Sequence, residues 1–209
     1  GTDEMRPRTT AQHRKFWRHR LLDWGRAYWT PLHPHRKHII WALTKLPVRS
    51  VMEVGCGAGV NLALIKAAFP SVFIGGVDIN PDAIEEAKKR MPGWPWDTQA
   101  ADDLFFSEDS TDIILSDMAL IYLGPRAVRK ALADYRQIAV QAVVLLELYH
   151  PSFWKRFKLW ITSGYFAHDY PKILKKLGYY NVEVTKIPAK DWPGEPQETY
   201  AHLIIGRIP

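Results

Sequence analysis

Val51-Met52-Glu53-Val54-Gly55-Cys56-Gly57-Ala58-Gly59-Val60-Asn61-Leu62 is the stretch that decides the fold of this chain. An apolar run ends at Val54 and meets three glycines at alternate positions, after which apolar residues recur at helical spacing. The pattern predicts a strand, a tight turn and a helix. Glycine lets the backbone turn sharply and lets a ligand reach main-chain atoms, while the start of the helix offers free N–H groups.

Two classes of ligand fit such a turn, a dinucleotide and S-adenosylmethionine (SAM). The dinucleotide fingerprint requires G-x-G-x-x-G, whereas the third glycine here comes one residue early, at Gly59, with Val60 after it. Glu53 lies just before the turn. A carboxylate there would repel a pyrophosphate but suits the ammonium group of a methionine moiety. The residues favour SAM, and the alternative is a glycine-rich turn that binds nothing.

The turn resembles motif I of the Rossmann-like (class I) SAM-dependent methyltransferases, which reads E/D-x-G-x-G-x-G. Glu53, Gly55, Gly57 and Gly59 carry the motif, and the resemblance extends over about residues 50–208. It implies an α/β fold with a doubly wound, seven-stranded, mostly parallel sheet and a C-terminal antiparallel hairpin. It also implies transfer of a methyl group from SAM to a nucleophilic O or N, with no metal required.

Charge is distributed unevenly along the 209 residues. Residues 1–50 hold 11 Lys and Arg against 3 Asp and Glu, whereas the remainder holds 17 against 19. Five of the eight histidines and four of the nine tryptophans also lie in residues 1–50. We therefore predict a helical, basic and aromatic N-terminal extension at residues 1–48 and a SAM-dependent methyltransferase domain at residues 49–209. The extension could meet an anionic substrate, nucleic acid or only solvent.

Composition indicates what class of protein this is and where we expect it to be located. Hydrophobic residues make up 47% of the chain, as in globular proteins. No apolar run approaches the ~20 residues that a membrane span requires, so we expect no membrane partner. The first residues are polar and charged and show no signal-peptide pattern. Because the single Cys56 cannot form an intrachain disulfide, a cytoplasmic location is the default expectation.

A second acidic position follows in Gly75-Gly76-Val77-Asp78-Ile79-Asn80-Pro81, where Asp78 lies 21 positions after Gly57. A carboxylate at the tip of the second parallel strand faces the ribose of a nucleoside held by the first turn, and accepts hydrogen bonds from both hydroxyls. The phrase resembles motif II of the methyltransferases. Asn80 followed by Pro81 also predicts a helix N-cap with proline in the first turn, which gives Asn80 a sufficient structural role.

The resemblance implies further cofactor contacts. An acidic residue after the third strand, expected at residues 94–100, would accept from the adenine amino group. Asp102 is the first choice and Asp103 the reserve, and two solvated loop acids are the alternative. Further cofactor contacts are expected beside the two motifs and after the fourth strand, from Cys56, Asn61, Ile79, Ser116 and Asp117.

Candidates for the acceptor side come from strand ends and from the extension. Tyr122 follows the fourth strand, and Glu147 and His150 follow the fifth, near the expected mouth of the crevice. A histidine there could act as a general base or could cap the strand end. In many members of the family an N-terminal helical segment covers the cofactor pocket, so the resemblance places four residues on the substrate side: Tyr28, Trp29, His33 and Arg36. Alternatively, the aromatic residues among them hold the extension onto the body.

His33, His35 and His38 raise the question of a metal site. Spacings of two and three residues are weak evidence, and no cysteine or acidic residue lies nearby in the sequence. We therefore predict no metal.

Residues 152–170 form a long connection rich in aromatic and basic side chains. We rank three interpretations: a lid or substrate wall, a helix packed on the core, and a platform for nucleic acid. The segment after the fourth strand lacks N/D-P-P-Y/F, the signature of resembling methyltransferases that act on the amino nitrogen of adenine or glutamine. Cys56 is committed to the turn, so no cysteine nucleophile is available for methylation at carbon 5 of a pyrimidine. Residues 119–122 and 147–151 resemble methylases associated with pseudaminic acid biosynthesis, in which His is expected at the position of Tyr122 and Asn at that of His150.

Together these features predict a SAM-dependent methyltransferase that acts on an O or N of a small-molecule acceptor. An RNA methyltransferase that uses its basic, aromatic extension is one alternative. A SAM-binding protein that acts as a partner without turnover is the other.

Overall fold

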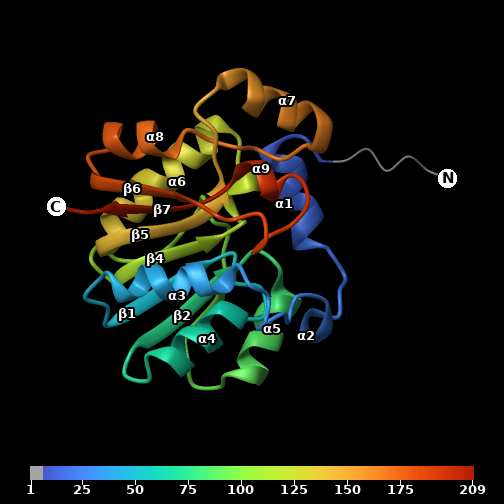
Figure 1. Cartoon of the computed structure of the whole chain (residues 1–209). Coiled ribbons are helices and arrows are strands. Elements are labelled where there is room, and N and C mark those ends of the chain that lie inside the picture. The colour runs from blue at the N-terminus through green and yellow to red at the C-terminus, as the bar shows by residue number, and fades with distance from the viewer. Residues whose placement is uncertain (1–6) are drawn as a thin grey trace.

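The computed structural model describes residues 7–209 (Figure 1). The helices are α1 (Thr10–Arg18), α2 (Trp24–Ala27), α3 (Arg36–Thr44), α4 (Val60–Ala68), α5 (Pro81–Arg90), α6 (Pro125–Ile138), α7 (Phe153–Ser163), α8 (Tyr170–Lys176) and α9 (Gln197–Tyr200), with a 3-10 turn η1 (Leu120–Tyr122). The strands are β1 (Ser50–Val54), β2 (Phe73–Asp78), β3 (Trp96–Thr98), β4 (Thr111–Asp117), β5 (Ala139–Leu148), β6 (Tyr180–Lys186) and β7 (Ala201–Arg207).

The strands form one seven-stranded sheet in the order β3-β2-β1-β4-β5-β7-β6. β1 to β5 pair in parallel, whereas β7 lies antiparallel to both β5 and β6. The chain turns outward in both directions from β1, so the topological switch point of the sheet lies between β1 and β4. Ligands of doubly wound sheets bind outside the carboxyl ends of the strands at this point. The predicted α/β fold class is confirmed.

Two apolar clusters cover the two faces of the sheet. One unites α3, α4 and α5 with alternate residues of the strands, among them Val51, Ile74 and Leu115. The other unites α6 and α8 with the intervening residues, among them Met52 and Val77. β1 and β4 are buried on both faces, which explains why they read as continuous apolar runs rather than as alternation.

The N-terminal extension contains three short helices, α1 to α3, within its described part. α1 begins with a capping box at Thr9 and ends at Arg18. The Asn80 side chain donates to the carbonyls of Trp17 and Arg20, at 2.8 and 2.9 Å, and so ties the end of α1 to the tip of β2. In α2, Trp24 is buried against Ala58 and Ala83. The domain boundary near residue 48 stays a prediction, and residues 1–6 of the predicted extension lie outside the described residues.

Two further segments depart from the sequence expectations. β3 is limited to Trp96–Thr98, because Pro95 has no N–H to donate and uses its carbonyl to accept from Gly76. Residues 152–170 form α7 and a return loop, and the sole buried residue of α7 is Leu159. Among residues 7–209, none of the helices combines the length and the apolar character that crossing a membrane requires.

Candidate cofactor and acceptor site

A cavity of about 290 Å³ lies at the carboxyl ends of β1, β2 and β4, beneath the N-terminal extension. Figure 1 shows α1 and α2 at the end of the sheet to which the parallel strands point. Of the predicted cofactor residues, nine line the cavity: Glu53, Gly55, Cys56, Gly57, Asn61, Asp78, Ile79, Asp102 and Asp117. Tyr28, Arg36 and Tyr122 from the predicted acceptor side also line it.

The glycine turn carries three positive φ angles, of 68° at Gly55, 54° at Gly57 and 84° at Gly59. The three positions differ in what requires glycine. A Cβ on Gly55 would lie 2.3 Å from the Cβ of Ala119, and one on Gly59 would lie 2.7 Å from Met91. At Gly57 the nearest atom would be on the Trp24 ring, 3.7 Å away, so this is the glycine with free space beside it. Gly59 lies outside the cavity lining and begins α4, which makes its role structural.

Asp78 ends β2 and is held by the turn itself. Its Oδ2 accepts from the Gly57 N–H at 2.9 Å, and its Oδ1 accepts from the Asn80 N–H at 2.9 Å. Burial raises the pKa of the Asp78 carboxyl, and these backbone hydrogen bonds oppose that shift. The geometry fixes the carboxylate at the tip of the second strand, as predicted.

Glu53 and Asp117, joined through Asn61, form a second acidic group in the cavity lining. Asn61 donates from Nδ2 to Glu53 Oε1 at 2.7 Å and to Asp117 Oδ2 at 3.0 Å, and its Oδ1 accepts from Arg36 Nη1 at 2.5 Å. The Glu53 side chain is buried, and its Oε2 has no hydrogen-bond partner. Burial raises the pKa of Glu53 well above its ordinary value. An unpartnered carboxylate oxygen at a cavity wall is a site for a cationic donor.

Asp117 receives two further partners from the extension. His35 Nε2 lies 3.0 Å and Arg36 Nη1 3.3 Å from Asp117 Oδ2. Burial alone would raise the pKa of Asp117, but the hydrogen bond and charge of His35, with the charge of Arg36, outweigh it and lower the pKa. Arg36 also donates to the Thr30 carbonyl at 2.8 Å and to Thr30 Oγ1 at 2.9 Å. Arg36, predicted on the substrate side, therefore braces the acidic network.

Aromatic side chains of the extension form the roof. The ring of Trp24 stacks on Tyr28 at 5.2 Å, and Trp17 contacts Tyr122 at 5.2 Å. The indole nitrogens of Trp17 and Trp24 are buried without hydrogen-bond partners. Burial raises the pKa of the Tyr122 hydroxyl well above its usual value, so this group is a hydrogen-bond donor at neutral pH. The roof thus offers aromatic surface and N–H and O–H donors.

Four contacts of α1 hold this roof onto the domain. The Thr10 hydroxyl accepts from the Gly124 N–H at 2.8 Å, and His13 Nε2 lies 2.9 Å from the Gly164 carbonyl. Arg14 donates to both oxygens of Asp102 at 2.8 Å. The fourth contact is the Asn80 link to the end of α1. The carboxylate predicted to read adenine is thus paired with an arginine of the roof, while the reserve, Asp103, is exposed and lies outside the cavity lining.

The structure does not bring every predicted residue to the cavity. Ser116 and Glu147 are fully buried beneath it, where Glu147 Oε1 accepts from Ser116 Oγ at 2.6 Å and from the N–H groups of Ala119 and Leu120 at 3.1 Å. Glu147 therefore caps η1 instead of facing an acceptor. His150 accepts from the Ser152 N–H at 2.9 Å outside the cavity lining, which matches the strand-end alternative.

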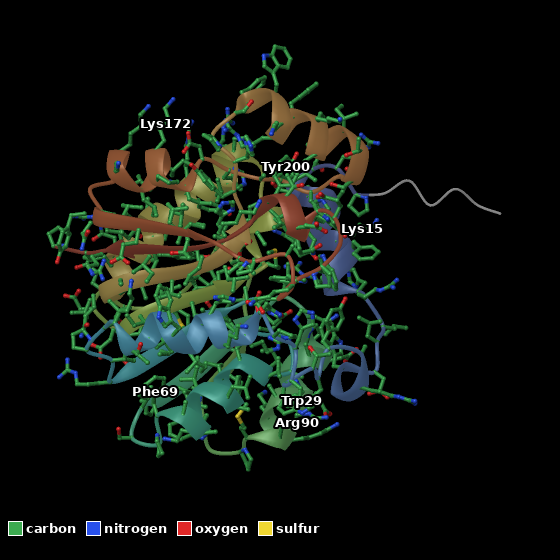
Figure 2. The ribbon with its side chains drawn as sticks, viewed as in Figure 1. Lys15, Trp29, Phe69, Arg90, Lys172 and Tyr200 are labelled. Carbon is green, nitrogen blue, oxygen red and sulfur yellow. The ribbon has the colours of Figure 1, made fainter. Side chains whose placement is uncertain are left out.

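Two residues of the extension also lie elsewhere. Trp29 lies under the Arg90 guanidinium, 4.0 Å from ring centre to Cζ, and Figure 2 shows the two side by side. It holds the extension onto α5, as the alternative interpretation proposed. His33 contacts His35, with 2.5 Å between the Nδ1 atoms, and does not line the cavity.

Glu147 yields a stability prediction. Burial raises the pKa of its carboxyl to about 8, against an ordinary value of 4.5. Because the folded pKa is the higher one, this group's contribution to stability is full below the unfolded pKa and is lost as pH rises through the folded pKa. The midpoint of thermal unfolding of the wild type should therefore fall relative to Glu147→Gln between about pH 5 and about pH 8. If the thermal midpoints of the two proteins changed with pH by the same amount across this range, the result would contradict the prediction.

Several cavity residues were missed by sequence reasoning: Thr10, His13, Arg14, Trp17, Trp24, His35 and Trp192. The available signal was the concentration of Trp and His before residue 50. Trp192 carried no such signal, because it lies in a proline-bearing loop and stacks on His35 at 4.0 Å only in the folded chain. His38 pairs with Asp191 at 2.8 Å, and within residues 7–209 no cluster of three or more His, Cys, Asp or Glu could hold a metal ion.

Comparison with known proteins shows what parts of the chain are similar to. Residues 51–141 match the model of a family described as methyltransferase domain. The chain is 29% identical over 99 residues to trans-aconitate 2-methyltransferase of Methylobacterium radiotolerans, covering 42% of this chain and 38% of that protein. It is 32% identical over 95 residues to malonyl-[acyl-carrier protein] O-methyltransferase of Anoxybacillus flavithermus, covering 43% and 36%. The matched segments thus span less than half the length of these two relatives.

Solved structures share the fold over almost the whole chain. Magnesium protoporphyrin IX methyltransferase of Synechocystis with bound SAM superposes with a TM-score of 0.68 at 16% identity, covering 96% of this chain and 97% of that one. A chain of the Haloferax volcanii complex between the Trm112 activator and a methyltransferase superposes with a TM-score of 0.67 at 18% identity, covering 94% and 97%. The resemblance to methylases of pseudaminic acid biosynthesis stays a prediction. Residues 51–141 match a methyltransferase family model, and the chain has the fold of the Rossmann-like (class I) SAM-dependent methyltransferases.

Proposed function

We propose that the protein transfers a methyl group from SAM to an O or N atom of a small-molecule acceptor. The observation that carries the proposal is the buried, unpartnered Oε2 of Glu53, in a residue that lines the same cavity as the fixed carboxylate of Asp78. One carboxylate suits an ammonium group and the other suits a pair of hydroxyls. These are the polar ends of an amino-acid-substituted nucleoside.

The residues present fit SAM. Glu53, with Asp117 beside it, would hold the methionine ammonium group, and Asp78 would accept from the ribose hydroxyls. Gly57 leaves open space next to Asp78, where a larger residue would intrude. Asp102 is committed to Arg14, so we assign adenine contacts to the cavity-lining backbone around it at Ala100 and Ala101, with Asp102 as their support.

When bound, SAM supplies both the methyl group and the leaving group. The protein therefore needs chiefly to align the acceptor and to exclude water. α1 and α2 cover the cavity, and Trp17, Tyr122 and Trp24 give it aromatic walls. Tyr122 donates from its hydroxyl and orients the acceptor.

A hydroxyl or amine acceptor must also lose a proton. His150 does not line the cavity, whereas His35 does, and Asp117 holds its Nε2 at 3.0 Å. The other ring nitrogen of His35, Nδ1, lies against His33 Nδ1, so both nitrogens are engaged. We therefore assign His35 a positioning role toward Asp117, and not proton acceptance.

The size of the partly open cavity supports a small acceptor. The four contacts described above hold α1 over the cavity. The volume of the cavity between its aromatic walls is about 290 Å³. The names of the two curated relatives refer to trans-aconitate and to a malonyl group. Carboxylic acids are therefore the first compounds to test, followed by phenols and amines.

Two measurements test the proposal. Calorimetry should show binding of SAM and of S-adenosylhomocysteine, and a coupled assay should show S-adenosylhomocysteine release with at least one acceptor of the panel. Filter binding with structured RNA serves as the comparison. Saturable RNA retention that persists at high salt, together with turnover on RNA alone, would move the acceptor class to RNA. SAM binding without turnover on any acceptor would favour a non-catalytic partner role.

Glu53 provides an independent signature of ligand binding. Burial raises its pKa in the free protein, and an ammonium group beside it would lower that pKa. SAM binding near neutral pH should therefore release up to about one proton. The heat measured in buffers of different ionisation enthalpy would report this release, and Glu53→Gln should abolish it. Equal proton release by wild type and Glu53→Gln would contradict the assignment.

A further inference from the structure

The helix α7 presents its apolar side to solvent. Its sole buried residue is Leu159, which packs with Ile121 and Leu148. Phe153, Trp154, Phe157 and Ile161 are 60%, 73%, 43% and 43% exposed. A helix turns about 100° per residue, so Phe153, Phe157 and Ile161 form one stripe with Trp154 at its border. That stripe lies on the side of the helix opposite Leu159.

This arrangement inverts that of an ordinary surface helix, which buries its apolar stripe and exposes its polar one. The aromatic rings also form a contiguous surface, with Phe153 stacked on Phe157 at 6.1 Å and Trp154 5.4 Å from Phe153. Contiguous exposed apolar patches of this kind mark interaction surfaces. Figure 1 shows α7 outside the two helical layers, at the top of the view.

The polar residues of α7 indicate the charge of the partner. The helix contains Lys155, Arg156 and Lys158 and no acidic residue. Arg156 is occupied by the carbonyls of His150 and Pro151, both at 2.7 Å. In the described part of the chain, neither Lys155 nor Lys158 forms an ion pair, and both are exposed. Further exposed lysines on α8, which include Lys172 at the upper edge of Figure 2, lie on the same side of the molecule.

A helix with an exposed aromatic stripe, Lys158 on the flank of that stripe and no acidic residue has the features of helices that lie in the interface of an anionic bilayer. We propose that α7 docks the protein on a membrane surface rich in anionic lipid, with Phe153, Trp154, Phe157 and Ile161 inserted among the headgroups. Nucleic acid suits the observations less well, because the stripe is convex and includes the aliphatic Ile161, which cannot stack on a base. The earlier expectation of no membrane partner rested on the lack of a spanning segment, and an interfacial helix needs none.

The position of α7 connects docking to the cavity. Leu159 belongs to the same apolar cluster as Tyr122 and Met118, which line the cavity. The loop after α7 places Tyr165 6.0 Å from Tyr122, and its Phe166 N–H donates to the Ile121 carbonyl at 2.8 Å. A bilayer on the exposed side of α7 is therefore separated from the Tyr122 wall by this one helix. The docking itself does not depend on the proposed methyl transfer.

Flotation with vesicles tests the proposal on the full chain. Wild type should bind vesicles of phosphatidylcholine with phosphatidylglycerol and should bind pure phosphatidylcholine vesicles at least about tenfold less. Phe153→Ser with Phe157→Ser, and separately Lys155→Glu with Lys158→Glu, should each reduce binding by about tenfold or more. Matched controls are Phe105→Ser, at an exposed aromatic residue far along the chain, and Lys89→Glu on α5, neither of which should change binding.

Tryptophan emission adds a readout specific to the stripe. The emission of wild type should shift to the blue on addition of anionic vesicles, and Trp154→Phe should lose most of that shift while still floating with the vesicles. Absence of wild-type binding to anionic vesicles would overturn the proposal, as would equal losses in the α7 variants and their controls. So would retention of RNA, but not of vesicles, that depends on the α7 residues. Circular dichroism of each variant confirms that the fold is intact.

Discussion

Asp78→Ala is expected to raise the dissociation constant of SAM by about 100-fold. A hydrogen bond to a charged acceptor contributes about 1.5–3 kcal/mol, and two such bonds to ribose hydroxyls would be lost. In the free protein the same carboxylate holds the Gly57 and Asn80 N–H groups at 2.9 Å, so the change also loosens the turn itself. Calorimetric titration with SAM and with S-adenosylhomocysteine measures the effect.

Two further variants distinguish a loss of ligand binding from a loss of folding. Asp78→Asn keeps the shape and one acceptor oxygen, and should show an intermediate affinity. Asp97→Ala removes an exposed carboxylate one strand away, on β3, and should leave the affinity unchanged. A folded Asp78→Ala protein whose affinity stays within about threefold of wild type would contradict the assignment of the ribose to this residue.

The sequence predicted the parts of the site that depend on local chain geometry. The glycine turn and Asp78 belong to adjacent parallel strands joined by one helix, so their spacing along the chain fixes their meeting at the sheet edge. The fold class followed from the same regularity. The fold class is confirmed, and the cofactor roles of these residues stay predictions. A strand, a turn and a helix leave little freedom for what lies at their junction.

The parts of the site that depend on tertiary packing could not be predicted in this way. Nothing in the local sequence indicates that Arg14 pairs with Asp102, 88 residues away, or that Trp192 covers His35. Glu147 was assigned to the acceptor side because strand ends form the crevice, but β5 continues past β4 and its carboxylate turns inward to cap η1. A carboxylate next to a strand end can thus face either the crevice or the core, and the sequence does not distinguish the two.

Gly55→Ala is expected to destabilise the protein strongly. Gly55 has a φ of 68°, and an added Cβ would lie 2.3 Å from the Cβ of Ala119. Gly93 has a similar φ of 86° but no atom within 4 Å of an added Cβ. Gly93→Ala therefore measures the backbone cost alone, about 1–2 kcal/mol, and Gly55→Ala should add the cost of overpacking, for a total of about 3 kcal/mol or more. Denaturant unfolding of both variants measures the difference.

A second substitution identifies the cause of that loss. If the overlap with Ala119 is responsible, Ala119→Gly should recover about 1 kcal/mol or more in the Gly55→Ala background, although alone it should destabilise the protein slightly. The contact between Gly55 and Ala119 matters for the ligand as well, because both residues line the cavity. The N–H of Ala119 also donates to the Glu147 carboxyl. Recovery of stability should therefore bring back SAM affinity in the double variant. Additive losses in the double variant would mean instead that strain at Gly55, and not contact with Ala119, sets the requirement for glycine.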